Sequence, residues 1–259
     1  MGPVRKWGPG PFPVIVVHGG PGAPGEVAPV ARELSAIKSV LEPFQTGTTL
    51  EEQVCELHAV LQEHGHVPVT LVGFSWGAFL SWIVAARYPD QVAKLILVGS
   101  PPFEEQYAAS VTKFRLNRLK SQDRAEAQTL MNDLEKPSVA DKNAIMAQLG
   151  TLLSRSDTFD PMPSEGSVFP CQYDIFKGVW AEANELRRTR ALLGMATSIA
   201  CPVVAIHGDW DPHPAEGVIA PLSRELKNFR FVLLEHCGHR PWIERQASEK
   251  FFKVLAEEI

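Results

Sequence analysis

The sequence predicts an α/β fold: a doubly wound, mostly parallel sheet interrupted by an inserted helical cap. Short apolar runs alternate with helical patterns in residues 1–100 and again in residues 200–259. This alternation is typical of parallel strands joined by crossover helices. Between about Pro101 and Ala200 the strand signal disappears and only helical patterns remain. We therefore expect a core made of residues 1–100 and 200–259, and a cap made of residues 101–199.

The first part of the core contains four candidate strands separated by helices. The run Val14-Ile15-Val16-Val17 is continuously apolar, as expected of a strand buried on both faces of a sheet. Thr49 precedes Glu52 by three residues, which is a capping-box start for a helix. Few residues precede the first strand, so we expect the sheet to be short at that edge. The strands are expected at residues 14–17, 39–41, 69–72 and 95–98, and the helices at 26–34, 50–61 and 76–88.

The cap and the second part of the core follow. Apolar spacing predicts cap helices within residues 111–119, 130–134, 146–153 and 175–186, and a proline-rich loop over 160–166. Strands return at 203–206 and 231–234, with helices at 216–226 and from residue 242. Because the sheet pattern resumes directly after the cap, an insertion is favoured over a separate helical domain with its own partner. It would lie over the carboxyl ends of the strands, where such sheets bind ligands.

The composition excludes several classes of protein. The 259 residues carry a formal net charge of −5 and a pI near 5.9, so the basic excess of a nucleic-acid-binding protein is missing. No apolar run is long enough to span a bilayer and no signal segment is recognisable, so we expect no membrane partner. The cysteines are far apart, as is typical of reduced thiols in a cytoplasmic protein: Cys55, Cys171, Cys201 and Cys237.

A serine stands between the strand at 69–72 and the helix at 76–88, in the sequence Gly73-Phe74-Ser75-Trp76-Gly77. A Gly-x-Ser-x-Gly turn between a strand and a helix is a nucleophile elbow, which exposes the serine hydroxyl above the sheet. The helix start would direct the Trp76 N–H towards an anion formed at Ser75. A plain turn with a capping serine is less favoured, because the required context is present on both sides.

A serine hydroxyl needs a neighbouring base, which a third group must orient. The segment after the strand at 203–206 supplies two carboxylates, Asp209 and Asp211. The segment after the strand at 231–234 supplies two imidazoles, His236 and His239. The sequence therefore offers a serine, an acid and a base in that order, each directly after a strand.

These motifs resemble those of α/β-hydrolase serine hydrolases, and more narrowly the proline iminopeptidase group. The resemblance rests on His18-Gly19-Gly20-Pro21-Gly22, the Gly-x-Ser-Trp-Gly elbow, Gly-x-x-Asp before Pro212 and Gly-His before Pro241-Trp242. It extends from about Val14 to the end of the chain, and the cap matches least. It implies that Asp211 is the triad acid and His239 the base, with Asp209 and His236 outside the triad. It also implies an oxyanion hole built from the N–H groups of Gly20 and Trp76, with His18 bracing the loop.

The resemblance further implies hydrolysis of a small ester or amide, or release of a peptide's N-terminal residue, through an acyl-enzyme intermediate. Phe103, Trp180 and Trp242 are candidate pocket residues, although aromatic residues at such positions are as often part of the core. Glu182 partly matches the family's Trp-Glu cap element, which holds the free amine of the substrate. Glu185 follows one turn further along the same helix, and Glu104 and Glu105 are rival carboxylates for the amine. Residues 42–47 lack the Asp-x-Arg-Gly sequence of proline iminopeptidases, which weakens the peptidase expectation.

We expect neither a cofactor nor a metal ion, and the partner should be a small-molecule or short-peptide substrate. The residue sets that could be drawn as metal sites lack further ligands at recognisable spacing: His64 with His66, His236 with His239, and Asp209 with Asp211 and His213. In the alternative hypothesis, the protein is a relative of these enzymes that binds and senses a small molecule and has little turnover. The three filled triad positions count against it.

Overall fold

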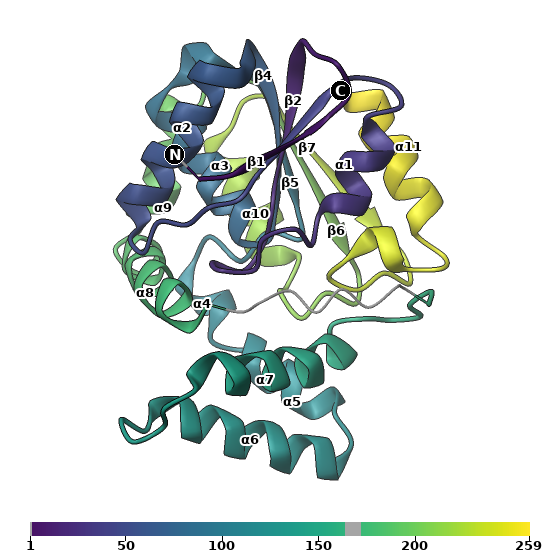
Figure 1. Cartoon of the computed structure of the whole chain (residues 1–259). Coiled ribbons are helices and arrows are strands. Elements are labelled where there is room, and N and C mark those ends of the chain that lie inside the picture. The colour runs from purple at the N-terminus through teal and green to yellow at the C-terminus, as the bar shows by residue number, and fades with distance from the viewer. Residues whose placement is uncertain (1, 164–171) are drawn as a thin grey trace.

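The computed structural model describes residues 2–163 and 172–259, and its centre is a seven-stranded sheet (Figure 1). The strand order is β1-β3-β2-β4-β5-β6-β7. Strand β1 pairs antiparallel with β3, and every other neighbouring pair is parallel. The predicted α/β class with a mostly parallel sheet is confirmed. The strands are β1 (Val4–Trp7), β2 (Phe12–Val17), β3 (Val40–Pro43), β4 (Gly65–Phe74), β5 (Val92–Val98), β6 (Val203–Gly208) and β7 (Phe229–Leu234).

Helices cover both faces of the sheet (Figure 1). Val14 and Val16 of β2 belong to the hydrophobic cluster of α1 and α11, whereas Ile15 and Val17 belong to that of α2, α3 and α10. This division explains why the β2 sequence is apolar at consecutive positions, because both faces of the strand are buried. The helices are α1 (Ala28–Leu34), α2 (Leu50–His64), α3 (Trp76–Arg87), α10 (Glu216–Glu225) and α11 (Ser248–Glu258).

Local sequence signals set several of these boundaries. The Thr49 side chain accepts from the Glu52 N–H at 3.2 Å, and the Glu52 carboxylate accepts from the Thr49 N–H at 3.1 Å, so the capping box predicted for α2 is present. The segment before β2 does form one short antiparallel strand, β1, which the sequence analysis missed. The last helix begins at Ser248 rather than at Trp242, because a separate 3-10 turn, η3 (Pro241–Ile243), precedes it.

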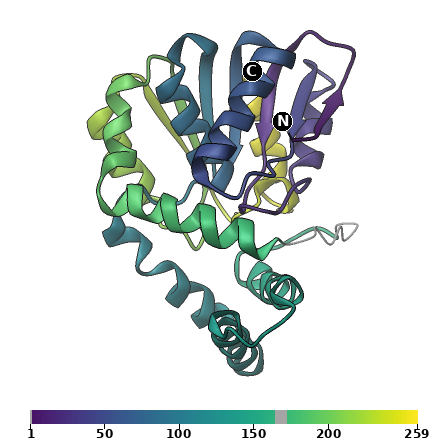
Figure 2. The ribbon, with the colours of Figure 1, turned by 60° about the vertical axis from the view of Figure 1, so that its left-hand side comes forward.

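The insertion between β5 and β6 divides into two packing units. Helices α8 and α9 bury Ile175, Val179 and Leu192 in the main core. Helices α5, α6 and α7, which lie to one side of the sheet (Figure 2), share a smaller cluster that includes Leu130, Leu149 and Tyr173 of α8. The predicted division of the chain at residues 101 and 199 stays a prediction. The elements are α4 (Glu105–Ala108), α5 (Val111–Arg118), α6 (Ser121–Glu135), α7 (Lys142–Ser156), α8 (Tyr173–Arg188), α9 (Ala191–Gly194) and η2 (Met195–Ser198).

Two further expectations concern the membrane and the cysteines. Within residues 2–163 and 172–259, no helix combines the length and apolarity that crossing a bilayer would require. Cys55 is exposed, Cys201 half-buried and Cys237 buried, and all three are free thiols. Cys171 and the end of the loop predicted at 160–166 lie outside the described residues.

Candidate active site

Ser75 sits on the sharp turn between β4 and α3. Its backbone has φ 51° and ψ −118°, a strained conformation for a residue with a side chain. The two glycines of the motif make this turn possible. A Cβ on Gly73 would overlap the carbonyl oxygen of Gly77, and a Cβ on Gly77 would overlap that of Val17 at the end of β2. The elbow is thereby pressed against the loop that follows β2.

The structure brings Ser75, His239 and Asp211 together at the carboxyl ends of β4, β7 and β6. The Ser75 hydroxyl donates to His239 Nε2 at 3.1 Å, and His239 Nδ1–H donates to Asp211 Oδ2 at 2.7 Å. His239 is 8% exposed and Asp211 6% exposed. A nucleophile, a base and a group that orients the base are therefore aligned in one hydrogen-bonded chain, which is suited to acyl transfer.

The rival acid and base lie elsewhere. Asp209 Oδ1 accepts from the Cys237 N–H at 3.0 Å, so it ties the β6 loop to the β7 loop. His236 is exposed, and its ring lies 5.1 Å from that of Phe159. Neither side chain reaches Ser75 through a hydrogen bond.

Three imidazoles surround the Asp211 carboxylate. In addition to His239, His213 donates to Oδ1 through its Nδ1 at 2.9 Å, and His207 Nε2 lies 3.6 Å from Oδ2. Burial opposes ionisation of Asp211, but the three histidines hold the pKa of this carboxyl well below its usual range. Burial lowers the pKa of His213 to about 4, despite the neighbouring carboxylate, so this imidazole is neutral at pH 7. Asp211 is thus ionised beside a neutral His213.

Buried contacts anchor the loop that carries His239 to the end of α7. The Glu244 carboxylate, which is fully buried, accepts from the N–H groups of Gly238 at 3.0 Å and Phe159 at 2.9 Å. The His239 N–H donates to the Asp157 carbonyl at 2.7 Å. Two parallel 2.8 Å hydrogen bonds in turn join the Asp157 carboxylate to Arg115 of α5. The position of the His239 side chain is therefore fixed by hydrogen bonds to its own backbone and to that of Gly238.

The loop after β2 carries the predicted oxyanion-hole glycine. His18 Nδ1–H donates to the Gly19 carbonyl at 2.7 Å, and its Nε2 accepts from the Gln45 N–H at 3.3 Å. Burial lowers the pKa of His18 to about 4, so the ring braces the loop in its neutral form. Gly20 has φ +26° and Trp76 begins α3, beside the same loop. The roles of the Gly20 and Trp76 N–H groups stay a prediction.

Glu26 is a second carboxylate close to this loop. A Cβ on Gly19 would come within 2.5 Å of its Oε1, and the charges of Arg240 and His239 act on this carboxyl. Desolvation raises the pKa of Glu26 to about 7, against the lowering effect of Arg240 and His239. A group that titrates near neutral pH thus lies beside the candidate base.

The predicted substrate residues separate into core and surface. Phe103 is fully buried, with ring centroids 5.2 Å from Phe79 and 4.9 Å from Trp82, so it is a core residue rather than a pocket wall. Trp242 packs edge-on against Phe74 at 4.7 Å, also in the core. Glu182 is exposed and accepts from the Leu50 N–H at 3.2 Å, so it caps the start of α2.

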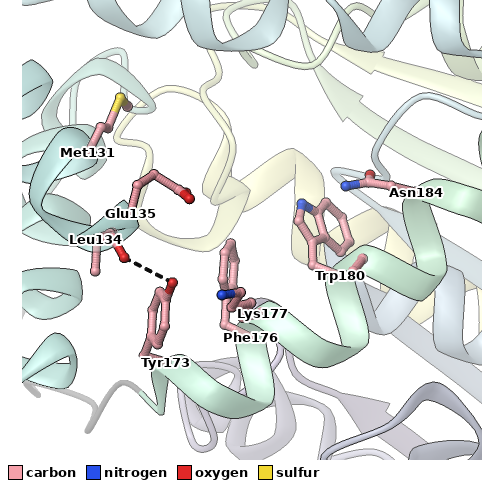
Figure 3. A pocket seen from close by; sticks show the side chains of 9 residues that line it. Met131, Leu134, Glu135, Tyr173, Phe176, Lys177, Trp180 and Asn184 are labelled. Carbon is pink, nitrogen blue, oxygen red and sulfur yellow. Dashed lines mark hydrogen bonds between the residues drawn. The ribbon is translucent and has the colours of Figure 1, made fainter. Parts of the chain in front are cut away.

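Trp180 is the predicted residue that does line a cavity. A groove of about 300 Å³ runs between α6 and α8, and the Tyr173 hydroxyl donates across it to the Leu134 carbonyl at 3.1 Å (Figure 3). The Trp180 ring also packs edge-on against Trp76, the neighbour of Ser75, with 5.8 Å between centroids. One wall of the groove therefore contacts the elbow helix. The apolar lining consists of Met131, Leu134, Tyr173, Phe176, Trp180 and Ala181.

One group of side chains in the described part of the chain has the spacing of a metal site. Ligand atoms of Asp211, His213 and His239 lie within 4.8 Å of one another. The same atoms already form the hydrogen bonds between these residues, so a cation would have to break them. The expectation of a metal-free site stays a prediction.

Three residues around the candidate triad were not predicted as site residues. His213 appears in the sequence only as part of a possible metal pattern, and Glu26 and Glu244 belong to no predicted motif. A glutamate directly after Pro241-Trp242-Ile243 could have marked Glu244, because a charge next to a buried apolar turn has to be paired. No sequence signal brings Glu26 to Gly19, since that contact depends on how the loop folds back.

Comparison with known proteins identifies the family. Residues 42–246, more than half of the chain, match the model of the alpha/beta hydrolase fold. The chain belongs to this family. Pimeloyl-[acyl-carrier protein] methyl ester esterase of Chromobacterium violaceum is 26% identical over 209 residues, which cover 77% of this chain and 73% of that protein. Epoxide hydrolase 4 of Mus musculus is 28% identical over 57 residues, which cover 22% of this chain and only 16% of that protein.

Several solved structures share the fold over nearly the whole chain. The crystal structure of VinJ superposes with a TM-score of 0.70 and 18% identity, covering 98% of this chain and 93% of that one. Proline iminopeptidase of Mycobacterium smegmatis gives 0.63 and 20% identity, with the same two coverages. The predicted resemblance to α/β-hydrolases is confirmed, and hydrolysis is the reaction class that family membership supports.

Proposed function

We propose that this alpha/beta hydrolase is a serine hydrolase that works through an acyl-enzyme intermediate. Ser75 attacks the substrate carbonyl while His239 takes the hydroxyl proton, and Asp211 stabilises the imidazolium that forms. His239 then gives the proton to the leaving group, and water releases the acyl group by the same route in reverse. The N–H groups of Trp76 and Gly20 bind the oxyanion of each tetrahedral intermediate.

One observation carries this proposal: the continuous chain of hydrogen bonds from Ser75 Oγ through His239 to Asp211, at 3.1 and 2.7 Å. A serine hydroxyl alone is a weak nucleophile at neutral pH, and this arrangement supplies the base and the charge that activate it. Opening an epoxide or a haloalkane would instead call for an aspartate at the elbow, where Ser75 stands.

For the substrate, we propose a small ester rather than a peptide. Glu182, the best candidate for holding a peptide amine, already accepts a hydrogen bond from Leu50 and is exposed. The groove between α6 and α8 offers an apolar, aromatic wall for the organic part of an ester (Figure 3). The similarity to a methyl ester esterase agrees with this choice.

The test combines active-site labelling with a substrate panel. We expect a fluorophosphonate to label the wild type stoichiometrically and Ser75→Ala not at all. Ser81→Ala, a change of a fully buried serine in the same helix α3, is the matched control and should label normally. Short-chain aryl esters should be hydrolysed faster than a proline arylamide. Equal labelling of wild type and Ser75→Ala would refute the mechanism, and full labelling with no turnover of any ester would favour the sensing alternative.

A further inference from the structure

The triad acid is shared between two imidazoles. Asp211 Oδ2 accepts from His239 Nδ1–H at 2.7 Å, and Oδ1 accepts from His213 Nδ1–H at 2.9 Å and from the His213 main-chain N–H at 2.9 Å. The centroids of the two imidazole rings lie 4.8 Å apart. His213 is only 6% exposed, so bulk water does not replace its hydrogen bond.

The fold holds His213 in place from below. His207, the penultimate residue of β6, is 1% exposed, and its Nε2–H donates to the His213 carbonyl at 2.8 Å. A carbonyl oxygen only accepts, so this contact fixes the tautomer of His207. The turn from Asp211 to His213 is therefore tied both to the carboxylate and to the strand beneath it. The bonds to the His213 carbonyl and from the His213 main-chain N–H do not involve its side chain. Only the bond from Nδ1 would be lost when the side chain is replaced.

We infer that His213 is a positioning residue for the hydrolysis proposed above, on which this inference rests. Its Nδ1–H fixes the rotation of the Asp211 carboxylate about χ2, so that Oδ2 stays in line with His239 Nδ1–H. Its second effect is on charge. Because the carboxylate also binds the His213 donor, it holds protonated His239 less tightly than an unshared carboxylate would.

Other charged groups face this cluster and have to be separated from the effect. Arg115 acts on His213, Arg118 acts on Asp211, and Glu26 and Arg240 lie near His239. A substitution of His213 alters none of these side chains. Any change in the pH profile that depends on the donor at position 213 is therefore assigned to the hydrogen bond with Asp211.

The test compares variants that keep or remove the donor while keeping the main chain. His213→Asn places a side-chain N–H close to the position of Nδ1. His213→Leu and His213→Phe have no donor there, and they differ from each other in shape. With a short-chain aryl ester, we expect kcat to fall about tenfold in the Leu and Phe variants, with little change in KM. The acidic limb of their kcat/KM profile should move to higher pH. His213→Asn should stay within about twofold of wild type in kcat and keep its pH profile.

A readout that needs no turnover separates this inference from the proposed function. The low-field proton resonance of the His239–Asp211 hydrogen bond should shift in the Leu and Phe variants and persist in His213→Asn. If all variants match wild type in rate, pH profile and resonance, the inference is overturned. If His213→Asn loses as much as the other two, the role is one of shape, which also overturns it. A wild type that neither labels nor hydrolyses, but shows the expected resonance changes, would refute only the proposed function.

Discussion

The main core and the cluster of α5, α6 and α7 differ in how completely they exclude water. Leu57, Leu61 and Leu71 of the main core are 0% exposed, whereas Leu130 and Leu149 of the cluster keep 8% and 9%. The core is enclosed by helices on both faces of a sheet, and the cluster consists of three helices beside one end of α8 (Figure 2). The residues that would perform the chemistry stand on the first region, and one wall of the groove stands on the second.

Polar contacts join the two regions at the loops of the candidate site. Arg115 of α5 pairs with Asp157, whose carbonyl accepts from the His239 N–H. Arg118 donates to the Trp210 carbonyl at 2.7 Å and lies 4.2 Å above the Trp210 ring. The candidate triad therefore stands at the edge of the enclosed sheet, while the α6 wall of the groove belongs to a less enclosed unit that is connected through the same loops.

The largest effect on turnover is expected at the sheet edge, where two neighbouring carboxylates, Asp211 and Asp209, can be compared. Asp211→Asn should lower kcat by about 10³–10⁴, because the amide cannot stabilise the imidazolium and favours the wrong tautomer of His239. Asp209→Asn is the matched control, and we expect at most a few-fold loss, since Asp209 only accepts from the Cys237 N–H. Steady-state kinetics with an aryl ester checks both. Comparable losses in the two variants would mean that the loop as a whole, rather than Asp211, is required.

The same contrast explains how far the sequence could predict the molecule. Strand runs such as 14–17 are fixed by burial on both faces, and the elbow at Ser75 follows from two glycines that no other residue can replace, so both were predictable. For Phe103 and Trp242 the sequence left a pocket role and a core role equally open, because an aromatic residue has the same local pattern in both, and the structure places them in the core. The contact between His213 and Asp211 was not predictable, because it depends on the conformation of the short turn that joins them. Hydrophobic periodicity carries no information about that conformation.

The packing difference itself can be tested with two leucines. Leu130→Ala should cost the α5–α7 cluster about 2–3 kcal/mol, because a buried leucine is lost from a small cluster. Hydrogen exchange should therefore rise in α6 and α7 while β4 and β5 stay protected. Leu71→Ala in β4 is the control, and it should raise exchange throughout the sheet. Equal loss of protection in the sheet of Leu130→Ala would show that the two regions unfold as one.

The junction between the regions is tested at Glu244. Glu244→Gln leaves three N–H donors, those of Phe159, Asp160 and Gly238, with one acceptor oxygen fewer. We expect the free energy of unfolding to fall by about 2 kcal/mol, and kcat to fall several-fold because Gly238 precedes His239. Glu249→Gln, an exposed change at the start of α11, should alter neither. Urea denaturation and ester kinetics measure the two effects; wild-type values for Glu244→Gln would remove this residue from the junction.

The groove wall should affect specificity rather than reaction chemistry. Trp180→Ala enlarges the groove and removes the contact with Trp76. For aryl esters with longer acyl chains we expect kcat/KM to change by about tenfold, the effect of a gained or lost apolar contact. The acetyl ester and the fluorophosphonate labelling rate should change by less than about twofold. Phe114→Ala, at an exposed position on α5, is the control. A uniform loss across the series would indicate that Trp180 supports the elbow instead of the substrate.

The last prediction concerns the pH dependence of stability, and it tests Glu26, which lies beside the loop after β2. Its pKa is raised from 4.5 to about 7 by desolvation, so between these values the folded protein holds a proton that the unfolded chain has released. Stability from this residue is therefore present below pH 4.5 and is lost as the pH rises towards 7. Glu26→Gln should remove that decline, by at most about 3 kcal/mol between pH 5 and pH 8 and by less in proportion to the solvent exposure of the carboxyl. Urea denaturation across this range tests the prediction, with Glu33→Gln on the exposed face of α1 as the control. A decline that persists unchanged in Glu26→Gln would place the titrating group elsewhere.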